Sequence, residues 1–223
     1  MSNSLRTALL IFKKDLKSEL RTRYVINSLV MFVLVTISII KFALGDEKTD
    51  NEILTGLLWI AVFFTSSNGL ARTFVKEEEK ETSIALKLST EPSGIITGKL
   101  IFNLVLTFIL NFFILILFML ITDYKIINVP GFLITIALGN IGLVSASTII
   151  AAIISKANSK GTLYPVLSFP VLLPLLMTVI NATKLASLGV ETDKLFGEIQ
   201  ILVSYTVVVT ISALLLFRYV WED

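Results

Sequence analysis

Six long apolar runs, separated by short polar segments, dominate the pattern of hydrophobic and polar positions along the 223-residue chain. Each run has the roughly 20 residues that a helix needs to cross a bilayer. Helices are expected because a backbone in contact with lipid must satisfy its own hydrogen bonds. The predicted spans are residues 24–44, 53–72, 100–122, 132–155, 163–188 and 199–219. The pattern therefore predicts an all-α polytopic membrane protein in which residues 1–223 form a single domain.

The fifth run is the least regular, because it contains Pro165, Pro170 and Pro174. Proline removes a backbone donor and bends a helix, although membrane helices tolerate it. A single kinked span is the favoured interpretation, and a broken helix or a helical hairpin is the alternative.

Composition narrows the class of protein further. The chain is 55% hydrophobic and only 16% charged, whereas a soluble domain carries about a quarter charged residues. The spans leave no room for a separate catalytic domain outside the membrane. The chain has no Cys and no His, which removes disulfides, thiolate chemistry and the imidazole that commonly ligates metals and haem iron.

The positions of Lys and Arg predict the orientation. If the N-terminus is cytoplasmic, most of the 19 Lys and Arg residues fall on the cytoplasmic side. Those on the outer side are Lys41, Lys48, Lys125, Lys184 and Lys194. Cytoplasmic segments carry the excess of positive charge in membrane proteins. Both termini are therefore predicted to be cytoplasmic.

Residues 1–23 form a basic, amphipathic segment before the first span. At helical spacing, one face carries Leu5, Ala8, Leu9, Phe12, Leu16 and Leu20. Lys14, Lys17 and Arg21 lie on the opposite side. This pattern favours a helix along the cytoplasmic membrane interface, and the alternative is a basic flank that only sets the topology.

The largest predicted cytoplasmic segment is residues 73–99, between the second and third spans. Glu77, Glu78 and Glu79 precede several apolar residues, and Pro92 lies near its end. Acidic residues are favoured in the first turn of a helix, so one or two short helices are expected. Charge combined with apolar residues at the membrane surface indicates a docking element, although a charged run can also be only a solvated face.

Motifs for chemistry within this chain are missing. No run fits the nucleotide-binding pattern GxxxxGK[ST], so ATP hydrolysis is expected on a separate subunit. No residue is nominated as catalytic or as a metal ligand, and no cofactor is expected to be bound by this chain. Nucleic acid is not expected among its partners.

Polar uncharged residues form a stripe on the third span. Asn103, Thr107 and Asn111 recur every four residues and therefore share one helix face. They either line a cavity for an amphipathic cargo or join helices by hydrogen bonds, each contributing about 1 kcal/mol or less.

The second span, the following segment and the later spans carry a recognisable set of residues: Gly56, Trp59, Arg72, Phe74, Lys99, Pro170 and Pro174. With these residues the chain resembles the CcmB family, the membrane subunit of the haem exporter in bacterial cytochrome c maturation. Their order and spacing match the family across most of the chain. The chain departs from the family at Glu81-Thr82, where many relatives have Gly-Thr or Gly-Ser.

The resemblance implies an ABC-2-like permease in the bacterial inner membrane. Two copies of the chain would assemble with two copies of a separate CcmA-like ATPase. CcmC-like and small membrane subunits and a haem chaperone would be further partners. The residues implied to couple to the ATPase are Glu77, Glu79, Thr82, Leu86 and Lys87.

Three functions remain open at this point. The first is ATP-driven handling of haem, by export of haem as cargo or by release of a haem-loaded chaperone. The second is an ABC-2 permease that exports a lipid, a glycan or a drug. The third is a non-transporting structural subunit that transmits the motion of an ATPase.

Overall fold

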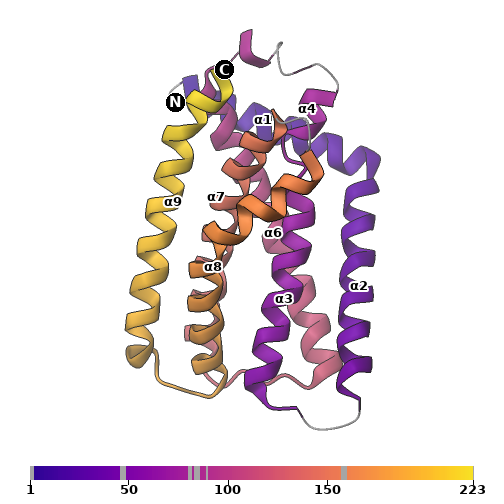
Figure 1. Ribbon diagram of the computed structural model, residues 1–223, viewed down its shortest axis with the longest axis vertical. Helices are drawn as coiled ribbons and strands as arrows, with labels where there is room; N and C mark the ends of the chain where they lie inside the picture. The colour runs from indigo at the N-terminus through magenta and orange to yellow at the C-terminus, as the bar shows by residue number, and fades with distance from the viewer. Residues whose placement is uncertain are drawn as a thin grey trace.

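The chain folds into a bundle of long helices, with the N- and C-termini at the same end (Figure 1). The computed structural model describes residues 3–45, 49–79, 82, 86–88, 90–156 and 160–222. The elements are α1 (Asn3–Thr22), α2 (Tyr24–Leu44), α3 (Asn51–Leu70), α4 (Val75–Glu79), α6 (Pro92–Thr122), α7 (Val129–Ser155), α8 (Lys160–Ser187), the 3-10 helix η1 (Thr192–Leu195) and α9 (Phe196–Glu222). The end that carries both termini is called the terminal end below.

The predicted all-α membrane architecture is confirmed. Within the described residues, six helices are long and apolar enough to cross a membrane: α2, α3, α6, α7, α8 and α9. The largest difference from the predicted boundaries lies in α6, which begins at Pro92 rather than at residue 100. Proline is favoured at the start of a helix because its missing N–H needs no partner there. The predicted segment of residues 73–99 therefore includes the first two turns of a span.

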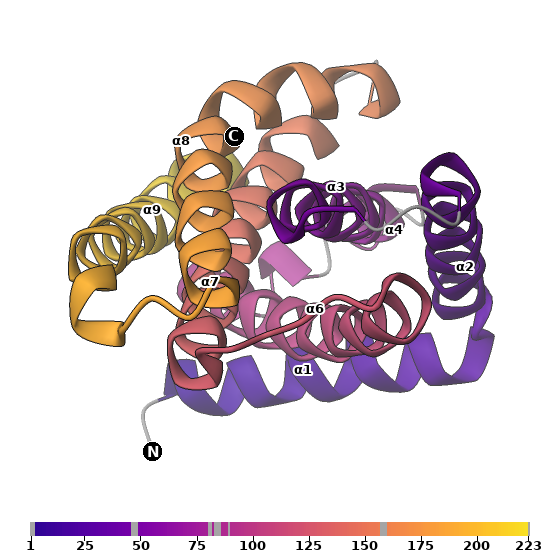
Figure 2. The same ribbon diagram turned by 90° about the horizontal axis from the view of Figure 1, so that it is seen from below.

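The fifth span is a single bent helix, as favoured from the sequence. Pro165, Pro170 and Pro174 all lie inside α8, and the bend is visible in Figures 1 and 2. The Tyr205 hydroxyl of α9 donates a 2.8 Å hydrogen bond to the Val171 carbonyl. Neighbouring helices can compensate in this way for the backbone bonds that proline weakens in a membrane helix.

Helix α7 forms the centre of the bundle and is the most buried of the six spans. Small residues let its backbone approach neighbouring helices closely. In lipid, where apolar side chains gain little by leaving their surroundings, such close packing is a main force that holds helices together. At Gly139 an added Cβ would lie 2.7 Å from Cη2 of Trp59 and 2.8 Å from Cγ1 of Val179. Trp59 is 1% exposed, and its Nε1 donates to Thr183 Oγ1 at 2.9 Å. The glycine therefore makes the space that this indole occupies.

Helix α1 lies across the long helices, alongside α6 at the terminal end (Figure 2). An added Cβ at Gly98 would lie 2.6 Å from the Ala8 carbonyl oxygen, and one at Gly94 would lie 2.6 Å from Cγ2 of Thr7. The two glycines thus allow α1 and α6 to touch almost backbone to backbone.

The predicted apolar stripe of α1 is divided between two environments. Ala8 is 1% exposed against α6, whereas Leu5, Leu9 and Leu20 stay about half exposed. Ile11, which was outside the predicted stripe, is 4% exposed and packs beside Gly98. The predicted stripe therefore lies mainly on the face turned away from the bundle, and Ala8 and Ile11 make the contact with α6.

The space beside Trp59 gives a test of this packing. Gly139→Ala should destabilise the protein by about 1–3 kcal/mol, because overpacking forces neighbours to shift. Gly56→Ala is the matched control: an added Cβ at Gly56 meets nothing within 4 Å, and alanine favours a helix over glycine by up to about 1 kcal/mol. Unfolding in detergent measures both changes, and equal stability of the two variants would contradict this account.

Candidate functional site

The turn after α3 is held by buried residues on both sides of one exposed side chain. Thr73 Oγ1 donates to the Leu70 carbonyl at 2.6 Å. The Phe74 side chain is fully buried, and the Thr73 carbonyl accepts a 2.8 Å hydrogen bond from Lys99 Nζ of α6. Arg72 is exposed between these anchored residues. The turn therefore fixes where the short helix α4 begins.

A cluster of four charged side chains joins α1, α4 and α6, with Lys99 and Glu77 buried and Lys14 exposed. Lys99 is 3% exposed and Glu77 is 5% exposed. Lys99 Nζ lies 2.7 Å from Glu77 Oε1 and 3.0 Å from Asp15 Oδ2. Lys14 Nζ lies 2.8 Å from the same Glu77 oxygen and 3.2 Å from Asp15 Oδ1. Two ammonium groups thus face two carboxylates, and the cluster is neutral as a whole.

Opposite charges in the cluster favour the ionised forms of Glu77 and Lys14. Burial by itself would raise the pKa of Glu77, but the ammonium groups of Lys99 and Lys14 outweigh it and lower that pKa below the ordinary 4.5. Burial would likewise lower the pKa of Lys14, and the carboxylates of Glu77 and Asp15 outweigh it and raise that pKa above 10.5. The contribution of Glu77 to stability is therefore lost as the pH falls, and that of Lys14 as the pH rises.

A second set of contacts ties α4 to the other side of the bundle. Glu78 Oε1 lies 3.5 Å from Lys156 Nζ at the end of α7. The Phe74 ring centroid lies 5.4 Å from that of Phe217 and 5.8 Å from that of Trp221, both in α9. Helix α4 is therefore connected to α1 and α6 through one carboxylate and to α7 through the next, while Phe74 packs on α9.

The chain beyond α4 forms an extension of the terminal end. Thr82 is exposed, and its backbone N–H donates to the Glu77 carbonyl at 2.9 Å. Residues 86–88 form a helical turn that projects past the ends of the long helices (Figure 1). Leu86 and Lys87 are half-buried there, whereas Leu88 is 85% exposed. Leu88 therefore presents an exposed apolar side chain on this turn.

The structure gives the predicted coupling residues different positions. Leu86 and Lys87 belong to the projecting turn, where Leu86 packs partly on the hydrophobic core, and Thr82 is exposed between α4 and that turn. Glu77 faces inward, so its effect on a docked partner would pass through the position of α4 rather than through direct contact. The side chain of Glu79 lies outside the part that the structure describes.

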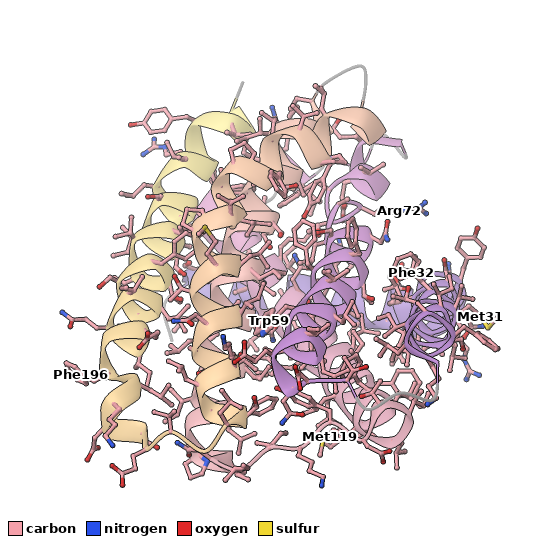
Figure 3. The ribbon with its side chains drawn as sticks, turned by 60° about the horizontal axis from the view of Figure 1, so that its bottom comes forward. Met31, Phe32, Trp59, Arg72, Met119 and Phe196 are labelled. Atoms are coloured by element: carbon pink, nitrogen blue, oxygen red, sulfur yellow. The ribbon has the colours of Figure 1, made fainter. Side chains whose placement is uncertain are left out.

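The residues that carry the family resemblance are spread over the bundle. Phe74 and Lys99 belong to the charged site or pack directly on it, and Arg72 lies at its edge. Trp59 lies within the bundle (Figure 3), and Gly56 lies in the same helix. Pro170 and Pro174 are exposed on α8.

Sequence reasoning missed Asp15, Lys14 and Lys156 as members of this network. The sequence pattern places Lys14 on the polar face of the N-terminal segment. It counts Lys156 among the cytoplasmic cations that predict the orientation. A clue was available for Asp15, an acidic residue in a basic helix. Asp15 follows Ile11 by four residues and Ala8 by seven, so the three share a helix face, which is the face that packs on α6.

The polar stripe of α6 makes hydrogen bonds to neighbouring helices. Asn103, Thr107 and Asn111 are all buried. Asn103 Nδ2 donates to Thr148 Oγ1 at 2.8 Å, and Asn111 Nδ2 donates to Asn140 Oδ1 at 2.9 Å. These bonds favour the helix-packing interpretation for both asparagines. Asn111 also borders an otherwise apolar cavity of about 310 Å³ between α3, α6 and α7.

Removal of the buried ammonium should show how strongly the cluster stabilises the fold. Lys99→Met should cost about 3–5 kcal/mol of unfolding free energy, because it leaves buried carboxylates with too little positive charge. Lys13→Met is the control, since Lys13 is an exposed cation of α1 and surface substitutions usually change stability by less than about 0.5 kcal/mol. Adding Glu77→Gln to Lys99→Met should recover part of the loss. Equal stability of the two lysine variants would contradict a stabilising role for the cluster.

The lowered pKa of Glu77 predicts acid sensitivity. The unfolding free energy should decline as the pH falls below the ordinary carboxyl pKa of 4.5, because Glu77 must take up a proton and release its lysine partners. Denaturant unfolding at a series of pH values measures this decline. Glu77→Gln should make it shallower, whereas Glu91→Gln, at an exposed carboxylate, should leave it unchanged. A decline of the same steepness in both variants would exclude Glu77 as its source.

A known protein family matches the chain along nearly its whole length. The family model described as CcmB protein matches residues 6–217 of the 223-residue chain. This match includes the four charged residues of the cluster and α4. No individual curated protein matches the chain. With six membrane-crossing helices and a family match along nearly its whole length, the chain belongs to the CcmB family.

Proposed function

We propose that this protein is the membrane permease subunit of an ATP-driven ABC complex that handles haem during cytochrome c maturation in the bacterial inner membrane. Family membership supports this proposal, because CcmB proteins are ABC-type permeases of haem export in that pathway. The lack of a GxxxxGK[ST] motif in the chain supports ATP hydrolysis on a separate, CcmA-like subunit.

One observation carries the mechanical part of the proposal: α4 is attached to both sides of the bundle. Glu77 pairs with Lys99 of α6 and Lys14 of α1, and Glu78 pairs with Lys156 of α7. A force applied to residues 82–90 by a docked ATPase would reach these helices together. The segment thus has the attachments that a coupling element needs, and its exposed leucine supplies an apolar docking contact.

The proposed assembly contains two copies of this chain and two ATPase subunits, with CcmC-like and small membrane subunits and a haem chaperone as further partners. The packing inside one chain favours a pathway for cargo between the two copies over a channel through a single copy. Asn103 and Asn111 are engaged with α7 and do not form a free polar lining. Closure of the ATPase pair would then move whole helices against the second copy.

Haem is proposed to be held mainly by another subunit. The chain has no His, which removes the commonest axial ligand of haem iron. Its part would be to convert ATPase motion either into haem export or into release of a haem-loaded chaperone.

The exposed leucine of the projecting turn provides the test. Leu88→Asp should reduce both ATPase binding and ATPase stimulation by about tenfold, because a charge replaces an apolar contact at the centre of an interface. The complex is reconstituted in vesicles, and ATP hydrolysis and ATPase retention are measured together. Leu188→Asp is the control, since Leu188 is an exposed leucine at the opposite end of the bundle.

The same vesicles separate the candidate functions. Movement of haem across the bilayer on ATP addition supports export. Release of the haem-loaded chaperone without haem movement supports the mechanical role. Full ATPase retention and stimulation with Leu88→Asp would overturn the assigned docking contact, and haem-independent transport of a lipid or glycan would overturn the haem assignment.

A further inference from the structure

A groove of about 210 Å³ runs between α2 and α3 at the terminal end. Val25, Leu29 and Phe32 of α2 form its apolar wall. Tyr24 and Arg72 are among its polar lining residues. The groove is separate from the hydrogen bonds of Asn103 and Asn111 and from the projecting turn that carries Leu88.

The polar and apolar parts of the groove are separated along the helix axis. Tyr24 is the first residue of α2 and Phe32 lies eight residues further along it, so at 1.5 Å per residue they are about 12 Å apart. Arg72 follows the last turn of α3, at the same end as Tyr24. Figure 3 shows the Arg72 side chain projecting away from the bundle, on the side where α2 carries Phe32. A cation therefore stands at the mouth and apolar side chains extend toward the membrane interior.

The backbone at the mouth is held in place by the residues that follow Arg72. Thr73 and Phe74 are fixed by the contacts to Lys99, Phe217 and Trp221. Within the part of the chain that the structure describes, the Arg72 guanidinium makes no ion pair and no hydrogen bond. An arginine fork presents several donors in a geometry that matches a phosphate.

Further positive charge surrounds the mouth. Arg23, next to Tyr24, is exposed, and so is Arg21 in the last turn of α1. Basic residues beside a membrane helix attract anionic lipids by about 1 kcal/mol each. The distribution of Lys and Arg assigns this end of the bundle to the cytoplasmic leaflet, where the headgroups would lie at the level of Arg72.

We propose that the α2–α3 groove binds an anionic phospholipid of the cytoplasmic leaflet. Its phosphate contacts Arg72, and one acyl chain lies along Val25, Leu29 and Phe32. The bound lipid is a site ligand rather than the transported cargo, so this inference is independent of the haem assignment. Val25 and Arg72 also line the neighbouring cavity that reaches Lys14 and Glu77, which brings the lipid next to the charged cluster.

The test measures lipid binding to the full-length protein in detergent by native mass spectrometry. The probes are dioctanoyl phosphatidylglycerol, dioctanoyl phosphatidylcholine and inorganic phosphate. Phosphatidylglycerol should bind more tightly than phosphatidylcholine, and Arg72→Gln should weaken phosphatidylglycerol binding about fivefold. Arg6→Gln is the matched control, because Arg6 is an exposed arginine of α1 outside the groove, and it should leave the affinity unchanged.

Two further variants separate the groove from a general charge effect. Arg72→Lys retains the charge and should keep most of the affinity. Ser28→Trp fills the groove beside an intact Arg72 and should weaken binding of both lipids. The proposal is overturned if Arg72→Gln binds phosphatidylglycerol like the wild type, if the two lipids bind equally, or if inorganic phosphate competes as well as the lipid. Unfolding midpoints identify any variant that has lost its fold. If Arg72→Gln is among them, Ser28→Trp decides the outcome, and unchanged phosphatidylglycerol binding by that variant overturns the proposal.

Discussion

The terminal end of this protein depends on one buried ammonium group. Lys99 is 3% exposed, and its Nζ contacts carboxylates from α1 and α4 and also donates to the Thr73 carbonyl. Its charge lies 5.3 Å from the centroid of the Phe74 ring, which adds a cation–π contact. Three segments that are distant in sequence therefore meet at one atom. A buried charge costs several kcal/mol when unpaired, so these segments have a strong reason to stay together.

The same charge chemistry gives α4 a role that its length alone would not. A helix of five residues is too short to be stable by itself. Its position is fixed by Glu77 on one side, by Glu78 on the other, and by Phe74 packed on α9. The base of the proposed coupling segment is thus anchored to the bundle, while Leu88 remains exposed. A partner that moves the helices through this segment would need both features.

The sequence was sufficient for the architecture because membrane helices are encoded by local composition. The six spans, the single bent helix α8 and a short acidic helix near Glu77 all follow from runs of residues within one segment. The charged site does not, because Asp15, Glu77 and Lys99 come together only when α1 folds back onto α6. That approach is made by Gly94 and Gly98, and glycines leave almost no trace in a hydrophobicity pattern. The run of acidic residues around Glu77 therefore did not show that its side chain points into the bundle. For Asn103, spacing alone left two interpretations open, and hydrogen bonding to a neighbouring helix was one of them.

The contact between α1 and α6 also determines how deep a span sits in the bilayer. Helix α6 has 31 residues and is about 46 Å long at 1.5 Å per residue, whereas the hydrocarbon core is about 30 Å thick. Some turns of α6 must therefore extend beyond the hydrocarbon core. The length of the helix alone does not decide on which side of the membrane they do so. Helix α1 lies along the first turns of α6 and leaves Leu5, Leu9 and Leu20 exposed, so insertion of these leucines into the membrane surface would hold the start of α6 at the interface. Lys99 would then lie near the headgroups, where a lysine is tolerated in an otherwise apolar helix.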